Sequence, residues 1–240
     1  MAAELLPSAS QGPCVLGIDA AWTAHQPSGV ALVQHTSEAW QCLALAPSYT
    51  AFLAQAAGQP PDPTQKSAGS RPDPQALLQA AQQLSGSSVA CIAVDMPLAQ
   101  TPITARRAAD TAISRRFAAQ GCSVHSPSAE RPGAIADQLR ADCTALGFAL
   151  HTAAGNNSPP ALIEVYPHVA LLALLKRRYR VPYKVSRSQW TTDHSHSARD
   201  PHRCRGAQPG FAQTDRRHAG CLDLQLGWHQ TSAGQDSRAR

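Results

Sequence analysis

"VLGIDAAWTAHQPSGVALV", residues 15–33, places an aspartate where a buried strand ends. Val15, Leu16 and Ile18 form an apolar run that predicts a core strand, and Asp19 closes it. A buried carboxylate is costly unless it is paired or binds a metal ion, so Asp19 needs a partner. After a turn rich in Pro, Ser and Gly, a second apolar segment at 28–35 predicts the returning strand of a hairpin.

The segments that follow extend this hairpin into a sheet. Residues 39–46 predict a third strand, and three short strands so close together favour an antiparallel meander. Residues 48–57 and 74–86 predict helices, the second ending in a Gly stop. Residues 88–99 form an almost continuous apolar run that ends near Asp95, as expected for a central strand buried on both faces.

The second half of the predicted domain alternates helices with one strand. Residues 104–121 predict a basic helix with Gly at its end, and residues 135–148 predict another helix. Residues 161–168 predict a strand that contains Glu164, followed by a helix at 169–179. The order of elements predicts an α/β fold with an antiparallel meander followed by further strands and flanking helices.

Composition limits the class of protein. With 240 residues, a net charge of +5 and a pI of about 9.0, the chain is long enough for one domain with a substantial core. The positive charge favours a polyanionic partner such as nucleic acid, and is also typical of a basic soluble protein. Seven cysteines without a CxxC pair predict reduced thiols and a cytoplasmic setting. We find neither a signal peptide nor an apolar stretch long enough for a membrane span.

Two segments differ in composition from the rest. Residues 58–74 are rich in Pro, Gly and Ser, which predicts a flexible insertion. Residues 189–240 lack Val, Ile, Met, Lys and Glu, and we expect this tail to be largely disordered. The predicted domain therefore covers residues 13–188.

Three acids occupy comparable positions in the predicted sheet: Asp19, Asp95 and Glu164. Acids at the ends of neighbouring strands converge at one edge, where mutual repulsion raises a pKa unless a cation is shared. Mg²⁺ or Mn²⁺ suits such oxygen ligands, and a pair of ions can activate water against a phosphodiester. The alternative is that each acid is a turn or cap residue.

Five blocks of sequence carry a resemblance: GIDAAWT with PSGVALV, AVDMPLA, RRAADTAISRRF, GCSVHSPSAERPG, and LIEVYPHVALLALLKRRYRVPYKVSRS. Together they resemble a family of predicted nucleases with an RNase H-like fold, usually described as a domain of unknown function. The resemblance implies an RNase H-like mixed sheet and a metal-dependent nuclease activity, with fold analogy as its basis.

The resemblance also implies roles for particular residues. Asp19, Asp95 and Glu164 match its acidic positions, which would be catalytic and would bind Mg²⁺ or Mn²⁺. Arg107 and Asp110 match an R-x-x-D pair that would contact the nucleic acid. His125 and His168 lie in matching blocks and are candidate proton carriers, although an exposed loop histidine is also ordinary.

The C-terminal part departs from this pattern after residue 188. The family continues with further helices and a block that supplies another acid, which the chain does not show. From residue 215 through 230, a one-nucleotide shift of the reading frame permits I-D-D-M-L-D-A-W-I-C-S-W-A-G-I-K, which is similar to that block. We therefore hypothesise that the tail is frame-shifted and that activity is impaired in this chain.

Two other functions stay open at this point. A phosphotransferase related to actin and sugar kinases would have the same core, although DAAWT lacks the Gly/Thr pattern that cradles a phosphate. A non-catalytic nucleic-acid-binding protein would fit the charge. The arginines of residues 104–121 would then contact phosphates or simply form a solvated helix face.

Overall fold

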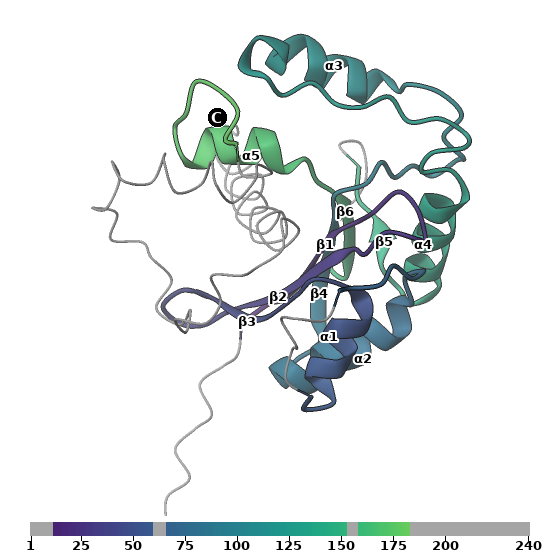
Figure 1. The fold of residues 1–240 in the computed structure, drawn as a ribbon. Helices are drawn as coiled ribbons and strands as arrows, with labels where there is room; N and C mark the ends of the chain where they lie inside the picture. The colour runs from purple at the N-terminus through teal and green to yellow at the C-terminus, as the bar shows by residue number, and fades with distance from the viewer. Residues whose placement is uncertain (1–11, 60–65, 153–157, 183–240) are drawn as a thin grey trace, which may run out of the picture.

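A mixed sheet forms the centre of the molecule (Figure 1). The computed structural model describes residues 12–59, 66–152 and 158–182. In these residues the sheet has six strands in the order β3-β2-β1-β4-β6-β5. Strands β1 (Cys14–Asp19), β2 (Gly29–His35) and β3 (Trp40–Ala46) form an antiparallel meander. The predicted hairpin and its third strand are confirmed.

Parallel strands continue the sheet on the other side of β1. Strand β4 (Val89–Val94) runs parallel to β1, and β6 (Ala161–Glu164) runs parallel to β4. A two-residue strand, β5 (Ala149–Leu150), lies at the edge. The α/β fold with an antiparallel meander, parallel strands and flanking helices is therefore confirmed, and it is consistent with an RNase H-like description.

Helices lie on both sides of this sheet (Figure 1). Helices α1 (Tyr49–Ala56), α2 (Pro74–Ser85) and α4 (Ala134–Ala145) pack over one face, around a core that includes Phe52, Leu77 and Leu139. Helix α3 (Ala108–Phe117), the short 3-10 helix η1 (Ala118–Gln120) and α5 (Pro167–Leu174) lie toward the other side. A smaller cluster that includes Val15, Cys91 and Ala93 marks that second face.

Local sequence explains where the first two helices begin and end. The Ser48 hydroxyl accepts a hydrogen bond from the Ala51 N–H at 3.1 Å and caps α1. Asp73 caps α2 in the same way, at 3.0 Å from the Ala76 nitrogen, and Pro74 stands at the first helical position. Gly86, with φ of 68°, ends α2 in the left-handed region that glycine adopts readily.

Some predicted boundaries change in the structure. The predicted helix at 104–121 begins at Ala108, because Arg107 is extended with φ −86° and ψ 162°. The predicted strand at 161–168 ends at Glu164, because Pro167 starts α5 at a position where a missing N–H costs nothing. β5 was not predicted, since two residues are too few to show a period.

Of the two segments of unusual composition, the insertion lies partly within the described residues and the tail lies outside them. Gly69, from the predicted insertion 58–74, lies close to the connection between β1 and β2. A Cβ built on Gly69 would be 2.3 Å from the carbonyl carbon of His25. The tail at 189–240, with its predicted disorder and frame shift, lies outside the described residues.

Two further predictions concern thiols and membranes. The five cysteines in the described ranges are free, and all except Cys42 are buried. Burial raises the pKa of the Cys91 and Cys143 thiols to about 12, which keeps them neutral in the core. No helix within the described ranges has the length and apolar composition that a membrane crossing requires.

Candidate active site

Asp19 and Asp95 stand side by side at one edge of the sheet. Ile18 is in register with Val94, and the Asp95 N–H donates to the Ile18 carbonyl at 2.9 Å. Because side chains alternate along a strand, Asp19 and Asp95 both lie on the face that carries Val15 and Cys91. Neighbouring strands are about 4.8 Å apart, so the structure brings these two carboxylates together. Asp19 is only 7% exposed.

Glu164 lies at the same edge but on the opposite face. It is in register with Val94 rather than with Asp95, so its side chain shares the face of Ile18 and Val94. Its Oε2 accepts a hydrogen bond from the Leu98 N–H at 2.9 Å. Across residues 12–59, 66–152 and 158–182, no three His, Cys, Asp or Glu side chains gather as a metal-binding group. A one-residue offset in register therefore separates Glu164 from the two aspartates.

Arg107 joins Glu164 to Asp110. Its guanidinium donates to Glu164 Oε2 at 2.6 Å and Oε1 at 2.7 Å, and to Asp110 Oδ1 at 2.6 Å and Oδ2 at 3.0 Å. A fifth hydrogen bond runs to the Leu98 carbonyl at 3.0 Å. These bonds use all the N–H donors of an arginine side chain. In this geometry the R-x-x-D pair fastens the start of α3 to the end of β6, rather than presenting a free cation.

Electrostatics agree with this arrangement. The hydrogen bonds to Glu164 raise the pKa of Arg107, against the effect of burial, and the contacts with Asp110 raise it further. Burial alone would raise the pKa of Asp110. Hydrogen bonds from the Arg107 side chain and backbone, and the arginine charges, instead lower that pKa below its usual value. Asp110 also accepts from the Arg107 N–H at 2.9 Å, which caps α3.

Tyr166 lies two residues after Glu164, within electrostatic range of Asp95, and was not predicted as a site residue. Its hydroxyl donates to the Ser123 carbonyl at 3.0 Å, which holds the segment after η1 near the sheet edge. Burial, then the neighbouring Cys122 and Asp95 groups, raise its pKa to about 12, while Arg180 acts in the opposite direction. His168 is buried beside it, with ring centroids 5.7 Å apart. The E-x-Y-P spacing was the available signal for Tyr166.

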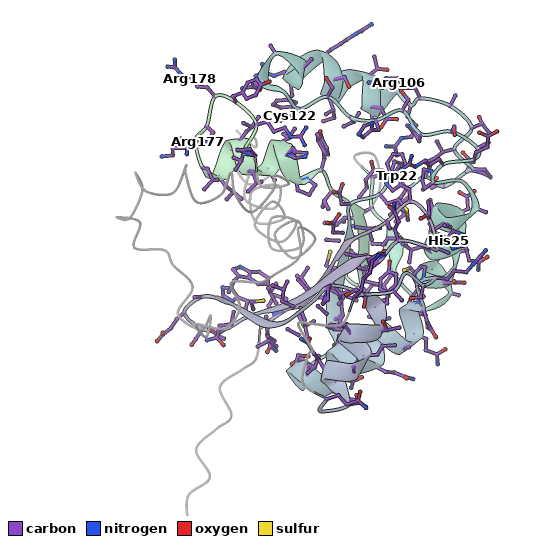
Figure 2. All side chains as sticks on the ribbon, in the orientation of Figure 1. Trp22, His25, Arg106, Cys122, Arg177 and Arg178 are labelled. Atoms are coloured by element: carbon purple, nitrogen blue, oxygen red, sulfur yellow. The ribbon has the colours of Figure 1, made fainter. Side chains whose placement is uncertain are left out.

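The candidate proton carrier His125 is exposed and lies near the end of β1. Its ring contacts the edge of Trp22, with centroids 6.4 Å apart at 82°. Trp22 belongs to the connection that follows Asp19 (Figure 2). His125 therefore comes close to the end of β1 that carries Asp19. His168 instead packs against Tyr166.

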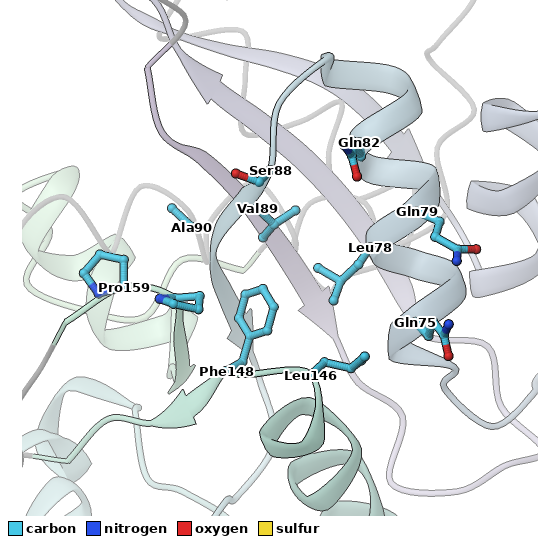
Figure 3. A pocket seen from close by; sticks show the side chains of 11 residues that line it. Gln75, Leu78, Gln79, Gln82, Ser88, Val89, Ala90, Leu146, Phe148 and Pro159 are labelled. Atoms are coloured by element: carbon cyan, nitrogen blue, oxygen red, sulfur yellow. The ribbon is translucent and has the colours of Figure 1, made fainter.

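The described pocket lies elsewhere in the fold. A shallow groove of about 540 Å³ runs between α2, the start of β4 and the residues before β6 (Figure 3). Leu78, Val89, Phe148 and Pro160 line it together with glutamines of α2. It is at the end of β4 opposite Asp95, and none of its lining side chains is ionisable. The carboxylate edge, and not this groove, holds the groups that could carry out chemistry.

A comparison with family models finds one match over residues 17–201, to the family described as protein of unknown function DUF429. This match covers most of the chain and includes Asp19, Asp95, Arg107, Asp110 and Glu164. The chain belongs to the DUF429 family. The DUF429 match ends beyond residue 188, where we placed the departure from the family pattern. Searches of curated proteins and of solved structures found no match.

Proposed function

We propose that this DUF429 protein is a divalent-metal-dependent nuclease that hydrolyses phosphodiesters in nucleic acid. The observation that carries the proposal is the position of Asp19 at the end of β1 beside Asp95, which directly follows the neighbouring strand β4. Asp19 is the last residue of the buried strand β1, and Asp95 directly follows the largely buried strand β4, so the sheet fixes the backbone of both acids. The mixed sheet and the net charge of +5 are compatible with this activity and a polyanionic substrate.

The donor set of this pair fits Mg²⁺ or Mn²⁺. Both ions prefer oxygen ligands, and Mg²⁺ is commonly held by one or two carboxylates together with water and substrate phosphates. Two carboxylates on neighbouring strands supply such a set. When bound, the ion provides Lewis-acid activation of the phosphodiester and of the attacking water. Asp19 and Asp95 would hold the ion in a defined position, because Asp19 is part of β1 and the Asp95 backbone is hydrogen-bonded to Ile18.

The remaining predicted residues divide between two roles. Arg107 and Asp110 tie the start of α3 to Glu164 at the sheet edge, and the neighbouring Arg106 holds the segment that carries His125 through the Ser126 hydroxyl. Glu164 stays a predicted third ligand. In the described geometry its side chain shares the face of Ile18 and Val94, and its two oxygens accept bonds from Arg107. We propose that Asp19 and Asp95 suffice to bind the ion.

The experiment is a comparison of Asp19→Asn with Asp142→Asn. Asp142 is on α4 and accepts from the Gln138 side chain at 2.7 Å, so the same chemical change is made away from the site. We expect Mn²⁺ to raise the thermal midpoint of the parent chain and of Asp142→Asn but not of Asp19→Asn. The parent chain should also cleave RNA, DNA or a hybrid only with Mg²⁺ or Mn²⁺, at the reduced rate that we expect from the departure after residue 188.

The other two functions give different results in this experiment. Stabilisation by ATP with Mg²⁺, without cleavage, would favour the phosphotransferase. Binding of nucleic acid without any metal-dependent cleavage would favour a non-catalytic binding protein. An equal Mn²⁺ shift in Asp19→Asn would contradict the proposed ion site.

A further inference from the structure

Three side chains from separate segments meet beyond the end of β1. The Trp22 ring receives His125 at its edge, with centroids 6.4 Å apart, and the Arg131 guanidinium carbon is 5.8 Å from the Trp22 ring centroid. Trp22 comes from the β1–β2 connection, His125 from the segment after η1, and Arg131 from the turn before α4. Figure 2 labels Trp22 on the side of the molecule where α4 lies.

Each of these segments is held by its own hydrogen bonds. The Ala21 N–H donates to the Ser28 hydroxyl at 3.0 Å and closes the connection that carries Trp22. Arg106 donates to the Ser126 hydroxyl at 2.7 Å, which fixes the backbone beside His125. The Ser128 N–H donates to the Arg131 carbonyl at 2.8 Å. The cluster is therefore preorganised by the backbone rather than assembled by its own weak contacts.

The chemistry of the cluster is that of a stacking site. His125 and Arg131 are exposed, and Trp22 is half-buried with one side packed on the core. Within the described ranges, Arg131 makes no salt bridge, although it carries a full positive charge. The Arg131 guanidinium lies over the Trp22 ring and shows no side-chain hydrogen bond to another described residue, so a base would stack on this arginine–tryptophan pair while the guanidinium donates to its phosphate.

The position of the cluster connects it with the carboxylate pair. Trp22 follows Asp19 by three residues, which span at most about 10 Å of chain. A base held against Trp22 would therefore place a nearby phosphate at the sheet edge. A base inside a duplex has both faces covered by its neighbours, so it reaches Trp22 only if it is unpaired or extruded.

We propose that Trp22, His125 and Arg131 form a stacking site for an unpaired base, and that the substrate is single-stranded nucleic acid. This inference rests on the proposed nuclease function for the role of the neighbouring carboxylates. Binding of a base at these three residues can be measured without cleavage, so the stacking site and the nuclease function can be contradicted independently.

The test measures binding without cleavage. A short fluorescein-labelled oligothymidylate is titrated with the full chain in EDTA, and its fluorescence anisotropy gives the Kd. An abasic strand of equal length has the same phosphates without bases, and an oligoadenylate–oligothymidylate duplex has bases with covered faces. We expect the oligothymidylate to bind at least about tenfold more tightly than the abasic strand, as stacking predicts. It should also bind more tightly than the duplex.

Variants with matched controls assign the effect to the cluster. Trp22→Leu keeps apolar packing but removes the ring and should weaken oligothymidylate binding about tenfold, while Trp22→Phe should retain most of it. Arg131→Gln and His125→Ala should each weaken it by less. The controls are His35→Ala, whose ring is 5.1 Å from Trp40, and Arg116→Gln, whose guanidinium is 5.6 Å from the Phe117 ring. Both should bind like the parent.

The outcomes separate the two proposals. Equal affinity of Trp22→Leu and the parent, or equal affinity for the abasic strand and the oligothymidylate, would overturn the stacking site. If the parent cleaves with Mn²⁺ in either of these cases, the nuclease function is supported and the stacking site is not. Loss of binding in Trp22→Leu with an unchanged thermal midpoint supports the stacking site, even if no cleavage is found. If Trp22→Leu unfolds, the comparison of Trp22→Phe and Arg131→Gln with their controls decides.

Discussion

The two faces of the sheet use their acids differently at the same edge. On one face, Asp19 and Asp95 lie side by side at the ends of adjacent strands. On the other, Glu164 is neutralised within the protein by Arg107, which also holds Asp110. The separation arises because Glu164 is in register with Val94 and not with Asp95, the next residue along the chain. Acids at the ends of neighbouring strands therefore form one site only if their side chains also share a face of the sheet.

The largest expected effect compares the two faces directly. Asp95→Asn should reduce Mn²⁺-dependent cleavage by at least about 100-fold. Losing a residue that only supports a metal ligand costs up to about 100-fold, and the loss of a ligand itself should cost no less. Glu164→Gln should keep the Mn²⁺-induced thermal shift, because its carboxylate faces Arg107. The measurements are single-turnover cleavage and thermal unfolding with and without Mn²⁺. If Glu164→Gln also loses the Mn²⁺ shift, the three-acid site is right and the comparison fails.

The second prediction concerns stability on the Glu164 face. Arg107→Ala leaves Asp110 buried without its cation, so we expect the free energy of unfolding to fall by about 2–3 kcal/mol. This value is below that for a fully buried pair, because the Glu164 side chain is 34% exposed. Chemical denaturation measures the change. Arg107→Lys should recover only part of it, since lysine cannot form the paired bonds, and exposed Arg115→Ala should change little.

A smaller effect should depend on pH. The folded pKa of Asp110 lies below its ordinary value of 3.8, so the stability it contributes is complete above that pH. This contribution is lost as the pH falls through the folded pKa, when the proton weakens the bond to Arg107. The free energy of unfolding, measured below pH 3.8, should therefore fall more steeply for the parent than for Asp110→Asn. Parallel slopes would show that Asp110 is not the responsible carboxyl.

The smallest effect is expected in the groove at the opposite end of β4. Gln79→Glu changes the charge of a residue that lines the groove, but no ionisable partner lines it. We expect cleavage and oligothymidylate binding to change by less than about twofold, as for an ordinary surface substitution. A large loss of either activity would show that the substrate extends to this end, and the distinction between the two ends would disappear.

Sequence reasoning was most successful where periodic burial decides the structure. The hydrophobic runs of β1, β2 and β4, and the glycine that ends α2, are local signals, so these strands and the end of this helix could be predicted. The sequence also placed Asp19, Asp95 and Glu164 at one edge. It could not show which face each acid occupies, because that depends on the register between β4 and β6, which are distant in the chain.

Other parts of the candidate site depend on contacts that no local pattern shows. The sequence placed Arg107 in a predicted basic helix, but the bonds of Arg107 to Glu164 join residues 57 positions apart. The contact of Trp22 with His125 likewise joins two distant parts of the chain, and no hydrophobic period predicts it. Such contacts follow from the assembled fold rather than from spacing.

The five hydrogen bonds of Arg107 also have a consequence for the order of folding. The two bonds to Glu164 can form only after β6 has joined β4, because Glu164 is the last residue of β6 and follows Arg107 by 57 positions. Closing such a loop costs chain entropy that local contacts in α3 do not recover. We therefore expect α3 to dock after the sheet is complete and to open before it, so that its amides exchange with solvent ahead of those in β1 and β4.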